Sequence, residues 1–74
     1  MIMSGSKNAT VRDIRVADIH GTRFYDIAFT HDDAPDAVRS ARIGIESVYE
    51  QPQVGDRVQV AYLMNVVVSV TRQQ

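Results

Sequence analysis

Two histidines and a group of aspartates are the residues of this 74-residue chain with the clearest capacity for chemistry. A catalytic triad needs a nucleophile beside a base that a third group orients. His20 and His31 are the only histidines. The strand pattern described below places them at opposite ends of one strand, up to about 30 Å apart at ~3.3 Å per residue. Because they can neither share a metal ion nor relay a proton to one another, we expect no catalytic residues and no enzyme.

The aspartates lie in the segment 31–36, His-Asp-Asp-Ala-Pro-Asp, which has the composition of a loop. Carboxylates at short spacings bind hard cations such as Ca²⁺, but this spacing matches no EF-hand loop. Aspartates also favour loops because their side chains bond local backbone amides. We interpret the segment as a solvated turn, with cation binding as the alternative, and expect no metal and no cofactor. The glycines are too scattered for a phosphate-binding loop: Gly5, Gly21, Gly44 and Gly55.

The composition is that of one small domain without disulfide bonds. The chain has no cysteine, and its eight basic and nine acidic residues give a net charge of −1. This balance argues against strong non-specific attraction to a phosphate backbone, although it allows a local basic face. The sequence contains no signal peptide and no stretch of the ~20 apolar residues that span a membrane. We therefore expect a cytoplasmic protein with no membrane contact.

The first element that positions these residues is a predicted hairpin from Thr10 to Thr30. His20-Gly21 has the composition of a two-residue turn, which needs positive φ at both residues when it is type I′. This turn sets four cross-strand pairs: Ile14–Ile27, Val16–Tyr25, Arg15–Asp26 and Asp18–Arg23. Such apolar and oppositely charged pairs each stabilise a register by about 0.2–1 kcal/mol. A one-residue slip would set Val16 against Asp26, so we expect the two-residue turn.

A second hairpin is predicted at residues 54–72, where valines alternate with other residues on both sides of a loop. Residues that lie opposite one another in an antiparallel pair point to the same face, which decides the loop length. A two-residue turn would set Val60 against Ser69. A three-residue loop at 63–65 pairs apolar residues instead: Tyr62–Val66, Val60–Val68 and Val58–Val70. We therefore expect the three-residue loop, with positive φ at Asn65.

The segment between the hairpins is predicted to add one strand and little helix. Residues 38–46 alternate, with Ala41, Ile43 and Ile45 on one side. Residues 47–50 have the spacing of a capping box, but a proline and a glycine follow closely, so at most one helical turn fits near 47–50. The main alternative is a mixed fold in which residues 36–43 are helical, because that run also tolerates a helix.

Together these elements predict an all-β domain over residues 10–72, preceded by a flexible N-terminal lead-in at 1–9. The order is two hairpins with a strand and at most one helical turn between them. It resembles a small five-stranded antiparallel barrel of the OB-like or SH3-like kind, in which the run 54–60, Val-Gly-Asp-Arg-Val-Gln-Val, is typical of a strand opening. No family-specific motif accompanies this architecture.

Two places break the rule that apolar side chains point inward. Phe24 and Ile19 belong to an apolar outer face of the first hairpin, and such clusters mark contact surfaces. The other members of that face are Val11, Ala17 and Ala28. The alternative is that barrel closure or a bulge covers it. Leu63 and Met64 occupy a hairpin tip, where turn residues are expected, so they either fold back onto the domain or contact a partner.

Two functions follow from these surfaces. The first is a non-catalytic interaction module that binds a protein partner or itself through Ile19, Phe24 and the tip 63–64. The alternative is an OB-like single-stranded nucleic-acid-binding domain, with Phe24 stacked on a base and three arginines on phosphates: Arg23, Arg39 and Arg42. Apolar contacts persist at high salt, whereas phosphate contacts weaken steeply with salt. No small-molecule substrate is implied.

Overall fold

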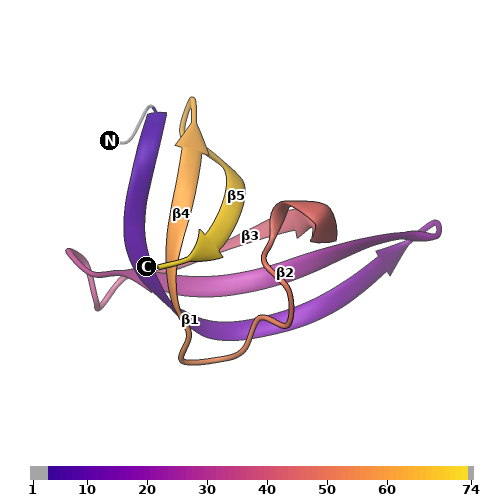
Figure 1. The fold of residues 1–74 in the computed structure, drawn as a ribbon, viewed down its shortest axis with the longest axis horizontal. Coiled ribbons are helices and arrows are strands. Elements are labelled where there is room, and N and C mark those ends of the chain that lie inside the picture. The colour runs from indigo at the N-terminus through magenta and orange to yellow at the C-terminus, as the bar shows by residue number, and fades with distance from the viewer. Residues whose placement is uncertain (1–3, 74) are drawn as a thin grey trace.

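Five strands form one antiparallel sheet in the computed structural model, which describes residues 4–73 (Figure 1). The elements are β1 Ser4–Ile19, β2 Thr22–His31, β3 Val38–Gly44, the 3-10 turn η1 Ile45–Ser47, β4 Arg57–Leu63 and β5 Val66–Arg72. The strand order is β3-β2-β1-β4-β5, so β1 is central and β3 and β5 are the edges. The all-β prediction is confirmed. The sheet is not closed, so the predicted barrel is not confirmed.

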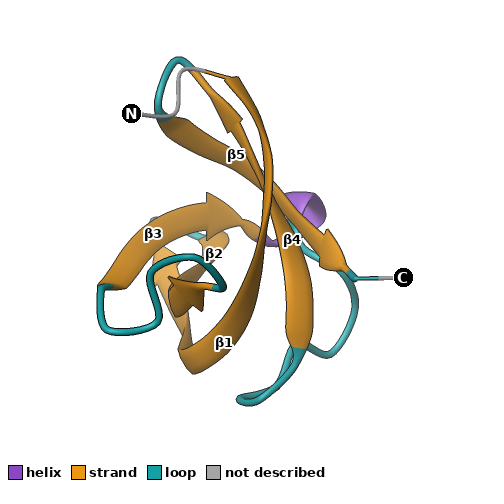
Figure 2. Cartoon of the chain, turned by 90° about the vertical axis from the view of Figure 1, so that its left-hand side faces the viewer, coloured by secondary structure: helices purple, strands orange, loops and turns teal. Residues whose placement is uncertain are grey.

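The central strand β1 belongs to two arms of the sheet. Its N-terminal half pairs with β4, and its C-terminal half pairs with β2. A bulge at Arg12 bends β1 between these halves, as an unpaired extra residue does in an antiparallel pair. Figures 1 and 2 show the result: an upper arm made of the start of β1 with β4 and β5, and a long arm made of the rest of β1 with β2 and β3.

The predicted lead-in at residues 1–9 is therefore wrong from Ser4 onward, because residues 4–9 are paired strand. Residues 1–3 lie outside the described part of the chain. The strand was hidden in the sequence because Gly5 and Lys7 occupy inward-facing positions where an alternating pattern would show apolar residues.

The first hairpin has the predicted register and turn. All four predicted cross-strand pairs are present, and the turn residues His20 and Gly21 have φ of 52° and 82°. One residue of the predicted outer face is misplaced: Val11 is fully buried and does not lie on the outer surface. The reason is the bulge at Arg12, which reverses the alternation of inward and outward side chains along β1.

The predicted three-residue loop of the second hairpin is also wrong. Met64 and Asn65 form a two-residue turn with φ of 51° and 66°, and Leu63 lies opposite Val66. The positive φ of Asn65 is as predicted. An extra residue on β5, Val68, forms a bulge opposite the step from Ala61 to Tyr62 and shifts the register, so that Val60 lies opposite Val70. The bulge lets a tight turn coexist with apolar pairing in the core, which an unbroken register cannot do.

The middle segment is strand, not helix, over most of the predicted range. β3 covers 38–44, so the helical alternative for 36–43 is wrong, and the single helical turn lies at 45–47, slightly before the predicted 47–50. After η1 the chain reaches β5, where Val48 makes a parallel bridge to Val70. The Tyr49 N–H donates to the carbonyl of Val70 across the same contact, at an N···O distance of 3.2 Å.

The core lies where the two arms meet, and one polar pair is buried inside it. Its apolar members are Ala9, Val11, Ile27, Phe29, Ile43, Val48, Val58, Val60, Tyr62 and Val70. His31 was predicted in a loop but is the last residue of β2 and only 3% exposed. Its Nε2 lies 2.6 Å from the hydroxyl oxygen of Tyr62, and its Nδ1 lies 3.3 Å from the carbonyl oxygen of Asn8. Because a carbonyl only accepts, Nδ1 donates to Asn8, and in the tautomer that carries its proton on Nδ1 the Nε2 atom accepts from the Tyr62 hydroxyl.

We expect Tyr62→Phe to lower the free energy of unfolding by about 1–3 kcal/mol, because it leaves the buried Nε2 of His31 without a donor. Urea titration measures the loss. Tyr25→Phe is the matched control, since the half-buried Tyr25 hydroxyl has no hydrogen-bond partner among residues 4–73, and a change within about 0.5 kcal/mol is expected there. Equal losses in the two variants would contradict the role given to the His31 pair.

The hydrogen bonds of Asp56 predict that the free energy of unfolding decreases at acid pH. Its carboxylate accepts from the Tyr49 hydroxyl at 2.6 Å and from the Gln53 N–H at 3.0 Å, and the Tyr49 bond above all lowers the pKa of Asp56. A lowered pKa in the folded state stabilises the fold above the unfolded value of about 3.9, and this stabilisation is lost as pH falls through the folded value. Urea midpoints measured from about pH 6 to pH 2 should therefore fall less steeply for Asp56→Asn than for the natural chain. Parallel curves would refute this assignment.

Candidate interaction surface

The three arginines proposed for phosphate contacts do not share one surface. Arg42 forms a bidentate pair with Asp26, with N···O distances of 2.7 and 2.9 Å, and this pair lowers the pKa of Asp26. Arg39 projects from the opposite side of β3, where its guanidinium lies 5.7 Å from the ring centre of the buried Tyr62. Arg23 lies opposite Asp18 beside the turn of the first hairpin. The predicted basic face is therefore split between different sides of the sheet.

Other basic side chains stand beside carboxylates. Lys7 pairs with Asp33 at 2.5 Å, which lowers the pKa of Asp33, and Arg57 pairs with Asp32 at 2.7 Å. These pairs are largely exposed and contribute little to stability, but the acidic partner offsets the attraction of each cation for phosphate. They also engage two carboxylates of the loop considered for a cation. Within residues 4–73, no group of three histidine, cysteine, aspartate or glutamate residues is arranged to hold a metal ion.

The predicted apolar face of the first hairpin is smaller than expected. Phe24 is half-buried and lies between its cross-strand partners Ala17 and Gly44, and Ile19 is 37% exposed near the turn. Val11 belongs to the core. Phe24 is therefore less available for stacking than the sequence predicts, because neighbouring strands flank it on both sides.

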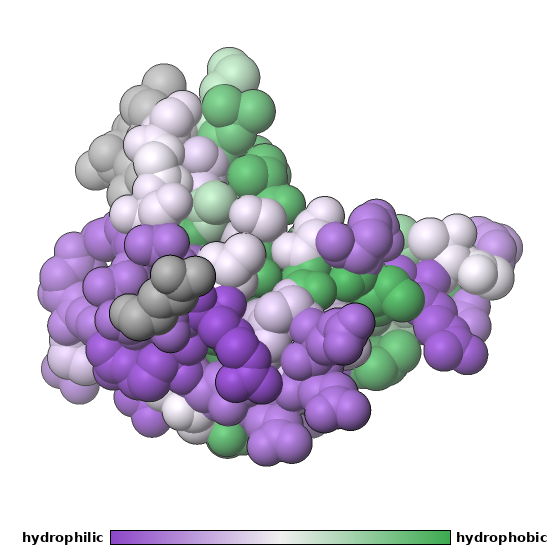
Figure 3. Space-filling model, viewed as in Figure 1, coloured by the Kyte–Doolittle hydropathy of each residue, from purple (hydrophilic) through white to green (hydrophobic). Residues whose placement is uncertain are grey.

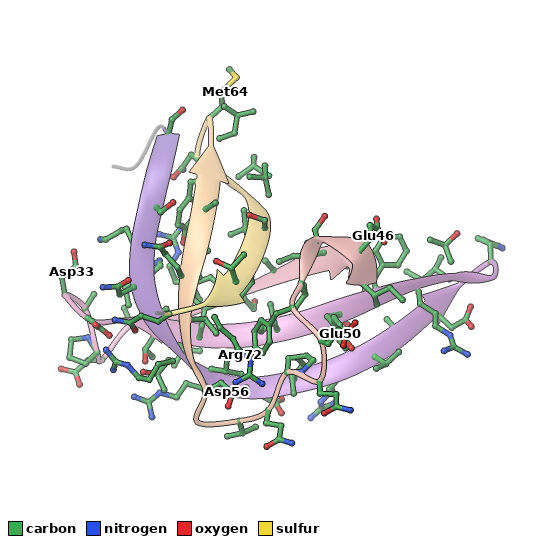
Figure 4. All side chains as sticks on the ribbon, viewed as in Figure 1. Asp33, Glu46, Glu50, Asp56, Met64 and Arg72 are labelled. Atoms are coloured by element: carbon green, nitrogen blue, oxygen red, sulfur yellow. The ribbon has the colours of Figure 1, made fainter. Side chains whose placement is uncertain are left out.

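The tip of the β4–β5 hairpin is the most exposed apolar feature of the described chain. Leu63 is 56% exposed, Met64 71% and Val66 61%, so the tip does not fold back onto the domain. Figure 4 shows Met64 pointing away from the fold at the far end of the hairpin. Hydrophobic side chains continue from this tip down the upper arm into the angle between the two arms (Figure 3). The tip predicted from the sequence thus remains the leading candidate for a contact surface.

The upper arm also presents an outer face that the alternation of the sequence does not reveal. Cross-strand partners on β1, β4 and β5 form its three rows, which are Ser4-Leu63-Val66, Ser6-Ala61-Ser69 and Asn8-Gln59-Thr71. We call these rows the upper-arm face. Its lower end borders a hollow of about 570 Å³ that Arg72 and Gln73 also line. One feature of the sequence does indicate this face: no residue from 59 to 71 is charged, although 23% of the residues in the chain are.

Among residues 4–73, no helix is long and apolar enough to cross a membrane. Comparison with known proteins found no family model, no curated protein and no solved structure that matches this chain. The function is therefore argued from the geometry of the chain itself.

If the tip serves contact rather than folding, its apolar side chains should contribute little to stability. We expect Leu63→Ser and Met64→Ser each to change the free energy of unfolding by less than about 0.5 kcal/mol, whereas Val60→Ala in the core should cost about 2 kcal/mol. Urea titration at low micromolar protein concentration measures all three. A loss above about 1 kcal/mol for Met64→Ser would mean that the tip packs against the domain.

Proposed function

We propose that this chain is a non-catalytic interaction module that binds protein through its upper arm. The observation that carries the proposal is a projecting hairpin that exposes Leu63, Met64 and Val66 without a charged residue among them. Large apolar groups held in water are unfavourable unless a partner covers them, and depletion of charge distinguishes the centres of protein interfaces. Both properties occur together on the upper arm.

The architecture of the proposed module is OB-like. Support comes from the five-strand order, from the helical turn η1 between β3 and β4, and from the parallel bridge that joins Val48 to Val70 on β5. An OB-fold is a partly open barrel, so an incompletely closed sheet is compatible with it. The fold alone assigns no ligand, because the same fold serves several functions.

Single-stranded nucleic-acid binding has weaker support than protein binding. OB-folds bind oligonucleotides on the face of their second and third strands, where this chain holds Arg42 against Asp26. Arg39 is directed toward Tyr62, and the half-buried Phe24 offers little stacking surface. The apolar tip contributes nothing to phosphate binding. The charge and aromatic layout therefore favours a protein partner.

Site-specific photo-crosslinking tests the proposal in the full chain. A benzophenone amino acid is placed at Met64 or, as the control, at Val54, which is 62% exposed in the loop before β4. In the cells that express the protein naturally, we expect at least about fivefold more protein adduct from position 64 than from position 54. Adding Leu63→Ser should reduce the adduct at 64, because apolar burial drives the contact.

Equal yields at the two positions, or no protein adduct from either, would remove the proposal. Adducts that nuclease treatment degrades would favour the alternative function. In that event a fluorescent single-stranded oligonucleotide should bind the purified chain at low salt and dissociate steeply as salt rises. The proposed protein contact, by contrast, should persist at high salt.

A further inference from the structure

We propose that Met64 is a reversible oxidation site, at which conversion of the thioether to a sulfoxide releases the partner from the tip of the β4–β5 hairpin. This regulation rests on the proposed function and adds a chemical control to it. Three features of the chain support it: the scarcity of sulfur, the exposure of the Met64 side chain and the backbone conformation of the turn.

The composition of the chain leaves methionine as the group that mild oxidants attack. Two-electron oxidants such as hydrogen peroxide react with the sulfur of cysteine and methionine, and the chain has no cysteine. Its methionines are Met1, Met3 and Met64, of which only Met64 lies within the described residues 4–73. The apolar core formed by those residues contains no sulfur atom. Peroxide therefore has a target at the tip and none in that core.

The thioether of Met64 is accessible to an oxidant in solution. The residue is 71% exposed, and Figure 4 shows its sulfur atom at the end of a side chain that points away from the fold. Oxidation converts a flexible apolar side chain into a polar one, and it disrupts structure where that side chain is packed in a core. Because Met64 is not packed against the domain, its sulfoxide should leave the fold intact.

The turn gives no structural reason for a methionine at position 64. Met64 is the first central residue of the turn and has φ of 51°, in the left-handed region. Asparagine, aspartate and glycine adopt this conformation at such positions with the least strain. The Met64 side chain gains no burial in return for the strain. Local strain without a packing benefit is the pattern of a residue that acts on something outside the domain.

The oxidation is a transfer of one oxygen atom. A lone pair of the Met64 sulfur attacks one oxygen of hydrogen peroxide, an S–O bond forms and the O–O bond breaks. The hydrogen on the transferred oxygen moves to the departing oxygen as a proton, so the products are the sulfoxide and one molecule of water. The sulfur loses two electrons and the peroxide gains them. Methionine sulfoxide reductases reverse the change. In that reversal two thiols supply the electrons, become a disulfide and release one molecule of water.

The added oxygen changes what a partner must bury. A sulfoxide oxygen accepts hydrogen bonds, and the group has no hydrogen to donate. Leu63 is 56% exposed and Val66 61%, so the oxygen is placed between apolar side chains at the tip. A partner that covers those side chains must bury the oxygen without a donor, which is unfavourable. We expect oxidation of Met64 to weaken the contact by about tenfold or more.

Peroxide treatment of the purified full chain, followed by peptide mass spectrometry, tests the site itself. We expect Met64 to gain one oxygen at a rate within about fivefold of its rate in the chain unfolded by urea, because it is exposed in both states. The urea midpoint of the oxidised chain should equal that of the untreated chain. A slower rate or a lower midpoint would mean that the folded domain shields Met64 and would overturn the inference.

The effect on the contact is measured with the benzophenone amino acid at Val66, so that Met64 stays in the chain. The purified chain is oxidised, freed of peroxide, added to a lysate of the cells that express it naturally and irradiated. We expect the protein adduct to fall by about fivefold or more and to return after treatment with the reductase. Met64→Leu is the matched control, because it keeps Met1 and Met3 but has no sulfur at the tip. Whatever its starting yield, peroxide should leave that yield unchanged.

The outcomes separate this inference from the proposed function. An adduct that peroxide does not reduce overturns the inference and leaves the proposed function standing. A fall that Met64→Leu shares assigns the sensitive group to Met1 or Met3 and also overturns it. No protein adduct from the untreated chain, at position 66 or at position 64, removes the proposed function and the regulation with it. A fall that requires Met64 and that the reductase reverses supports the inference.

Discussion

The bend of β1 at Arg12 is the constraint on which the rest of the structure depends. One strand serves two arms, and Val11, just before the bulge, is held from both sides. It pairs with Phe29 on β2, while its N–H donates to the carbonyl of Asp56 and its carbonyl accepts the N–H of Gly55. The bulge reverses the alternation of side chains beyond it, so both arms can turn their apolar faces toward the same core. Because the core fills only the angle between the arms, the far end of the upper arm extends past it.

Charged side chains occur on both arms but not on the β4–β5 hairpin between residues 59 and 71, and that charge-free hairpin is the candidate surface. The long arm carries the exposed pair Asp26–Arg42, and the pair Lys7–Asp33 joins the start of β1 in the upper arm to the loop after β2. The projecting hairpin carries exposed apolar and uncharged polar side chains instead. Exposed ion pairs contribute little to stability, but they keep a surface hydrated and discourage association. The tip of the β4–β5 hairpin lacks that protection, which is why it is a better candidate for contact than the long arm, although the long arm holds more aromatic residues.

Local pairing was predictable from the sequence, whereas features set by distant contacts were not. The first hairpin followed from cross-strand pairs such as Ile14–Ile27 and Arg15–Asp26, which reject any slipped register. The predicted loop of the second hairpin is one residue too long. The bulge at Val68 combines a two-residue turn with apolar cross-strand pairs in the core, and a strictly alternating pattern cannot predict that combination. The start of β1 was missed because β4, not its own pattern, makes it a strand. For the same reason the sequence predicts His31 in a loop, although it ends β2 and is buried against Tyr62, which is distant in sequence. The sequence predicts the exposed Leu63-Met64 tip, but the outer face beside it can be recognised only from the register of three strands.

A protein with an exposed uncharged sheet face must also avoid open-ended association, and the edges of this sheet address that requirement. β5 is interrupted by its bulge and partly covered by the chain after η1, and β3 carries Arg39 and Arg42 along its length. Such bulges and charges oppose the addition of further strands. A domain of this size buries a small core, and a contact with a partner adds apolar burial without enlarging the chain. Protected edges beside the exposed apolar tip therefore favour contact through the tip over the addition of further strands to the sheet.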